Sequence, residues 1–140
     1  MATSGQGLIQ AFKNAYSGTV KRYRPVVQST TDSGQKTFTK CSAQTDKVLG
    51  ILSQDSLSQS KHTDVIISGT AQVRVANGIT VTQGDYVGLD STDFEGVGPL
   101  TINFGGSTSV ICIGQALETA TGTTGDVKAE VRLMLVPVKI

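Results

Sequence analysis

The sequence predicts an all-β protein, a single compact antiparallel β-sandwich or barrel with an extended N-terminal arm that can hold one short helix. Three observations support this fold class. About nine short segments combine β-prone residues with apolar–polar alternation, turn residues separate them, and 16 glycines punctuate the chain. A length of 140 residues suits one domain. The apolar share of 38% is low, which indicates a thin core and surface that becomes buried only on assembly.

The N-terminal segment differs from the rest of the chain. Residues 1–7 are small and polar, so we expect them to be disordered or to lie on a partner. Apolar side chains then follow at near-helical spacing and predict a two-turn helix ended by Gly18. These side chains are Leu8, Ile9, Phe12 and Tyr16. Because so short a helix is marginal in water, we assign residues 1–20 to an arm and residues 21–140 to the β domain.

The segments with strand character follow one another at short intervals. Pro25 confines the first to a sheet edge or a bulge, and Gly50 indicates a bulge or a close approach in the third. Residues 32–34 (Asp-Ser-Gly) predict a turn, and residues 53–63 a polar loop. The nine segments are 20–27, 37–41, 48–52, 65–67, 71–75, 79–81, 86–89, 110–113 and 127–135.

The middle of the chain allows a test of register. A two-residue Asn-Gly loop would place the apolar residues of the flanking strands on opposite faces. A three-residue loop over residues 76–78 would instead pair Val75 with Ile79. The next pair, Val73 with Val81, would then share that face. We therefore predict the longer loop if these strands pair, with its glycine in a left-handed conformation.

The last third combines a long connection with two clear strands. Residues 90–109 are polar and glycine-rich, and so long a connection is usually functional or bound to a partner. Residues 110–113 are continuously apolar and predict a strand covered on both faces. In the final strand the alternation puts Val127, Ala129, Val131, Leu133 and Leu135 on one face and Lys128, Glu130 and Arg132 on the other. We expect Pro137 to end its pairing.

The charge distribution is uneven although the net charge is only +1. Residues 1–47 hold seven basic and two acidic residues, and residues 48–140 hold five and nine. This asymmetry suits docking onto a partner or a neighbouring copy, and it equally suits a solvated surface with no such role. A basic set with interleaved aromatics (Tyr16, Lys21, Arg22, Tyr23 and Arg24) is a weak nucleic-acid signal. Because the remainder is acidic, we expect no nucleic-acid partner, and no segment has the roughly 20 apolar residues of a membrane helix.

Residues that could carry out chemistry are few. His62 is the only histidine and has no metal-ligand spacing around it. Cys41 and Cys112 are expected to be buried free thiols. The acidic loop Asp90–Glu95 is best interpreted as solvated, with weak calcium binding left open. No nucleophile elbow or phosphate loop is present. We therefore expect no enzyme activity, metal or cofactor, and the absence of a signal peptide predicts synthesis in the host cytoplasm.

The order of several motifs resembles the decoration (cement) proteins of tailed-bacteriophage capsids. The resemblance runs from about Tyr23 to Pro137. Its pieces are DKVLGIL, the alternation Val65, Ile67, Gly69, Ala71, Val73 and Val75, the segment GITVTQGDYV at 78–87, the segment IGQALETA at 113–120, and VRLML. The resemblance implies a β-tulip-like domain that forms homotrimers on the outer capsid surface and joins neighbouring major capsid proteins.

Under this interpretation the arm and the long loop supply the contacts with the capsid or between copies. The predicted interface residues are Leu8, Ile9, Phe12, Tyr16, Lys21, Arg22, Arg24, Phe94, Leu100, Ile102 and Phe104. Packing of both segments on the protein's own domain is an equal alternative. A tail or baseplate component and a carbohydrate-binding β-sandwich are the alternative functions. The absence of tryptophan counts against the carbohydrate-binding module, and a hydrolase ranks third.

Overall fold

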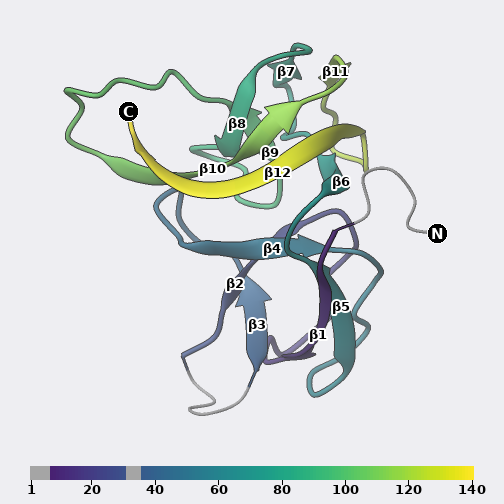
Figure 1. Ribbon diagram of the computed structural model, residues 1–140. Coiled ribbons are helices and arrows are strands. Elements are labelled where there is room, and N and C mark those ends of the chain that lie inside the picture. The colour runs from purple at the N-terminus through teal and green to yellow at the C-terminus, as the bar shows by residue number, and fades with distance from the viewer. Residues whose placement is uncertain (1–6, 31–35) are drawn as a thin grey trace.

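The computed structural model of the protein describes residues 7–30 and 36–140 (Figure 1). The turn expected at 32–34 and the segment 1–6 lie outside the described residues. The predicted all-β class is confirmed, and the described residues contain no helix and so no helix that could cross a membrane. The strands are β1 (Ile9–Asn14), β2 (Pro25–Gln28), β3 (Thr37–Lys40), β4 (Val48–Leu52), β5 (His62–Ile66), β6 (Thr70–Arg74), β7 (Thr80–Val81), β8 (Tyr86–Leu89), β9 (Val97–Pro99), β10 (Ser109–Ala116), β11 (Ala120–Thr121) and β12 (Lys128–Lys139).

The strands form two stacked units. The first is a closed barrel in the order β1-β3-β2-β4-β5, and the second is a five-stranded sheet in the order β6-β12-β10-β8-β9. A two-stranded sheet of β7 and β11 completes the second unit. Strand β4 is the barrel strand that faces the sheet, with the other barrel strands on its far side (Figure 1). All pairings within the sheets are antiparallel except that of β1 with β3, which is parallel.

The short helix expected over residues 8–16 is wrong, because this segment forms β1. Its backbone pairs with β5 from Ile9↔Ile66 to Lys13↔His62 and with β3 on its other side. Phe12 is buried inside the barrel. Strand pairing on both sides outweighs a helical spacing that offered only four apolar positions. The described part of the predicted arm thus lies within the barrel, and the domain boundary at residue 20 stays a prediction.

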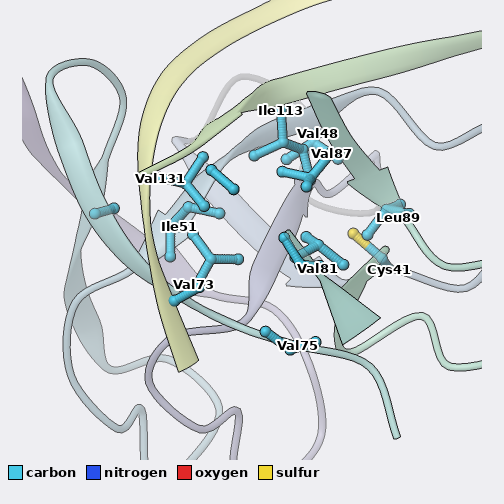
Figure 2. Packing of buried hydrophobic residues seen from close by; sticks show 14 residues of the cluster. Cys41, Val48, Ile51, Val73, Val75, Val81, Val87, Leu89, Ile113 and Val131 are labelled. Carbon is cyan, nitrogen blue, oxygen red and sulfur yellow. The ribbon is translucent and has the colours of Figure 1, made fainter. Parts of the chain in front are cut away.

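Each unit has its own apolar core, and β4 contributes to both. Phe12, Phe38 and Leu52 belong to the barrel core, whereas Val48 and Ile51 face the sheet. Figure 2 shows the two latter side chains against Val73, Val87, Ile113 and Val131 of the sheet. A register shift between β2 and β4 inserts an extra residue into β4, so positions three apart point the same way.

The predicted role of Gly50 is confirmed, because an added Cβ would lie 2.4 Å from the Ile66 carbonyl oxygen.

The hairpin predicted in the middle of the chain does not form. Strand β6 pairs with β12, and β7 pairs with β11, so Val73 and Val81 are not partners. Gly78 does have the expected positive φ of 75°. It lies in a turn closed by a hydrogen bond from the Ile79 N–H to the Ala76 carbonyl (3.1 Å).

Two expectations for the C-terminal third need correction. The connection over residues 90–109 is interrupted by β9, which pairs with β8. Pro137 does not end the pairing of β12, which continues opposite β10 to Lys139. Proline is tolerated here because β6 covers the other edge of β12 only as far as Arg132. The predicted inward alternation holds for Ala129 and Val131, which are fully buried.

Candidate interaction surfaces

Buried arginines join the barrel to the sheet unit. Arg24, directly before β2, is only 7% exposed. Its Nη1 donates to the Asp126 carboxylate and to the Arg22 carbonyl (3.2 Å), and its Nε lies 3.7 Å from Glu95. Glu95 also pairs with Lys40 of β3 (3.5 Å). The basic residues of the barrel therefore meet acidic residues of the sheet unit within one chain.

Arg74 of β6 anchors the loops on the same side. It is 5% exposed, and its Nη1 donates to Asp93 (2.8 Å), its Nε to the Gly125 carbonyl (3.0 Å) and its Nη2 to the Thr123 carbonyl (3.4 Å). Burial alone would raise the pKa of the Asp93 carboxyl. Hydrogen bonds from the Asn77 N–H and from Arg74 outweigh that effect, so this pKa lies below its usual value.

The acidic loop Asp90–Glu95 uses its carboxylates on its own chain. One oxygen of Asp90 accepts hydrogen bonds from the N–H and hydroxyl of Thr92 and from the Asp93 N–H, at 2.9–3.1 Å. Asp93 is held by Arg74. Within residues 7–30 and 36–140 no group of three or more acidic, histidine or cysteine side chains could hold a metal ion.

Other candidate chemical residues are also accounted for by packing. Cys41 and Cys112 are buried and free, as expected. Burial raises the pKa of the Cys41 thiol to about 12, so it stays protonated and poorly nucleophilic. His62 lies on β5 rather than in a loop, and its side chain is exposed.

The structure separates the predicted interface residues into three groups. Phe12 and Arg24 are buried within the chain. The half-buried residues are Tyr16, Phe94, Leu100 and Ile102. The exposed residues are Leu8, Ile9, Lys21, Arg22 and Phe104. The burial of Arg24 could not be seen in the sequence, because its acidic partners lie about 70 and 100 positions away.

Phe104 is the most exposed large apolar side chain described, at 97%. Its loop is nevertheless well held, because the Asn103 N–H donates to the Lys139 carbonyl (2.8 Å) and the Gly106 N–H to the Asn103 carbonyl (2.9 Å). The Ile140 N–H bonds the Thr108 carbonyl on the other limb (2.9 Å). Figure 1 shows this loop beside the C-terminus, projecting from the sheet. A fixed backbone that presents an uncovered aromatic ring suits insertion into a partner's pocket.

A second exposed apolar site lies at the start of β1. Leu8 and Ile9 are about half exposed. The backbone there is fixed by hydrogen bonds from the Leu8 N–H to Ser68 Oγ (2.8 Å) and from the Ile67 N–H to the Leu8 carbonyl (2.8 Å).

Sequence reasoning missed several exposed apolar residues, namely Leu57, Tyr86, Leu117, Met134 and Val136. Met134 and Val136 could have been found, because they belong to the unbroken apolar run 133–136. When only one face of a strand is covered, such a run leaves every second side chain exposed.

Two adjoining polar grooves, each of about 520 Å³, lie along β2 and the end of β3. The residues common to both are Val27, Gln28, Ser29, Thr30 and Asp46. Tyr16 lines the first groove, but the ammonium of Lys40 lies 4.8 Å from its ring centroid. One face of this ring is therefore occupied by Lys40.

Comparison with known proteins shows the fold of this chain. No protein-family model matches the sequence, and no curated protein matches it. Among solved structures, the chain is similar to the N base of head fiber gp8.5 of bacteriophage phi29, with a TM-score of 0.63 and 16% identity. The match covers 95% of this chain and 97% of that one, so both barrel and sheet unit correspond.

Proposed function

We propose that this protein is a structural component of a tailed-phage virion, which binds the outer capsid surface and cements neighbouring major capsid proteins. The observation that carries the proposal is the near-complete fold correspondence with the base of a phage head fiber. The ordered motifs that resemble capsid decoration proteins point independently to the same class of protein.

The distribution of exposed residues supports a binding role. Phe104 and the pair Leu8 and Ile9 lie on different units, each on a backbone fixed by hydrogen bonds. A protein with apolar contacts on two units can touch two neighbours at once, and simultaneous contacts multiply weak affinities. Separating the capsid proteins would then require breaking both contacts.

No catalytic activity is part of this proposal. The side chain of His62 is solvent-exposed and both thiols are buried. The protein would work through added interface area alone, and a stable interface buries roughly 1,600 Å² in total.

The proposal is tested by mixing the purified protein with undecorated capsids of the phage that encodes it and sedimenting them. We expect saturable co-sedimentation and higher resistance of the capsids to heat. Phe104→Ser should weaken binding without lowering the protein's own melting temperature, whereas Leu57→Ser, at another exposed apolar site, should bind as the wild type does. Failure of the wild-type protein to co-sediment would refute capsid binding.

A second candidate is the base of a head appendage, since that is what the similar phi29 protein is. Such a base would bind the capsid without joining its subunits. Capsids saturated with protein would then show no gain in heat resistance, which distinguishes this role from cementing.

A further inference from the structure

Three segments distant in sequence meet where the two units join. The Arg74 N–H donates to the Tyr23 carbonyl (2.9 Å), and the Val75 N–H donates to the Val127 carbonyl (2.8 Å). This brings Lys128 to the Tyr23 ring, with its ammonium 4.8 Å from the ring centroid. The Arg22 guanidinium carbon lies 4.9 Å from the same centroid. The Tyr23 ring therefore makes cation–π contacts with both Arg22 and Lys128, which lie far apart in the sequence.

The cations at this place are exposed and have no ion-pair partner among the described residues. Lys21, Arg22 and Lys128 take part in none of the described salt bridges. Two acids lie close by: Asp55 accepts the backbone N–H of Arg22 (2.9 Å), and Asp126 pairs with buried Arg24 while also feeling the charge of Lys21. The charge of Lys21 is therefore partly balanced by Asp126, whereas those of Arg22 and Lys128 are open to solvent.

The backbone at Tyr23 is strained. Its φ is 69°, in the left-handed region that a bulky residue rarely adopts. Both units hold it there, because its N–H donates to the Leu52 carbonyl of β4 (2.8 Å) while its own carbonyl accepts from β6. Strain of this kind in a non-glycine residue is concentrated at functional sites.

We infer that Lys21, Arg22, Tyr23 and Lys128 form a cationic patch that docks onto a carboxylate-rich surface of a partner protein. The inference rests on the proposed function, in which that partner is the major capsid protein. It adds Tyr23 and Lys128 to the contact residues and defines the chemistry of the opposing surface.

The patch suits protein carboxylates better than other anions. Nucleic-acid binding of single strands needs aromatic faces open for base stacking, and here both cations lie over the Tyr23 ring. Membrane binding needs more basic residues and an apolar side chain to insert. Three clustered cations on a protein whose net charge is only +1 suit short-range steering toward an acidic protein surface.

The test compares two triple charge reversals with the same change in net charge. The patch variant is Lys21→Glu/Arg22→Glu/Lys128→Glu, and the control is Lys36→Glu/Lys47→Glu/Lys61→Glu, which alters three other exposed lysines. Binding to undecorated capsids is measured at about 50 mM and about 300 mM NaCl. Far-UV circular dichroism verifies folding, and the neutral variant Lys21→Gln/Arg22→Gln/Lys128→Gln is used if the reversal disturbs Asp126.

We expect the patch variant to lose about tenfold to a hundredfold in affinity and most of its salt dependence, while the control keeps both. Equal binding by patch and control variants overturns the inference but leaves the proposed function standing. Failure of the wild type to bind capsids overturns both. Loss of duplex DNA binding in the patch variant, with capsid binding unchanged, would assign the patch to nucleic acid and also overturn the inference.

Discussion

Replacing Arg74 by methionine tests whether the buried arginine holds the loops on the sheet. Methionine keeps much of the aliphatic volume but removes the ion pair to Asp93 and two hydrogen bonds to the Gly125 and Thr123 carbonyls. All three bonds have the charged guanidinium as donor, and each hydrogen bond of that kind contributes about 1.5–3 kcal/mol. Part of this is offset because a buried cation no longer has to be desolvated. We expect a net loss of about 3 kcal/mol in the free energy of unfolding, or about 10 °C in Tm.

The assay is urea unfolding at neutral pH, with Arg132→Met as the matched control. Arg132 is exposed and makes one hydrogen bond, to Gln115 (2.9 Å), so its loss should be below about 0.5 kcal/mol. Equal losses for the two variants would refute the reasoning.

The pH dependence of the Arg74→Met effect provides a second check. The pKa of Asp93 is lowered in the folded protein. Its ion pair therefore contributes fully above the unfolded value, at about pH 4, and is lost as pH falls through the folded value. The difference between wild type and Arg74→Met should shrink in acid to the part carried by the two carbonyl hydrogen bonds. A difference that grew in acid would contradict the assignment.

Other substitutions test the packing and the exposed surfaces. Gly50→Ala should destabilise the protein by about 3 kcal/mol, because its Cβ would lie 2.4 Å from the Ile66 carbonyl oxygen. At Gly78 an added Cβ meets open space and only the positive φ is unfavourable, so Gly78→Ala should cost about 1 kcal/mol. Thermal melts of the two variants test this, and equal losses of stability would contradict the close approach at Gly50. Phe104→Ser should change the free energy of unfolding by less than about 0.5 kcal/mol, since the ring has almost no contacts to lose. A larger loss, measured by chemical denaturation, would mean that the ring is covered. Cys41 should resist a thiol-labelling reagent at pH 8 until the protein unfolds, because burial raises its pKa to about 12. Rapid labelling of the native protein would show that the core between the barrel and the sheet opens.

The strand character of the chain could be predicted because period-2 alternation is local information. Ala129 and Val131 are buried where the alternation put them, and the continuous run 110–113 lies within β10. The segment 8–16 was ambiguous, because its few apolar residues fit a helix as well as a half-buried strand. Pairing with β3 and with β5, whose residues lie up to 57 positions away, decides for the strand.

Strand partners and charge partners could not be predicted from the sequence. Strands β6 and β7 are neighbours in the chain, yet β6 pairs with β12 and β7 with β11. The C-terminal strand β12 lies between β6 and β10 in the sheet. Arg24 has the sequence context of an exposed basic cluster and is instead buried against acids of the other unit. For Phe104 the sequence left exposure and packing on the protein's own domain equally open, and only the structure shows the ring to be 97% exposed.

Cryo-electron microscopy of undecorated capsids, imaged before and after addition of the protein, tests the central claim most directly. The account predicts extra density on the outer surface, at threefold or quasi-threefold positions, that fits the stacked barrel and sheet and touches more than one major capsid protein. Unchanged capsid maps at saturating protein concentration, or density confined to the tail, would contradict it.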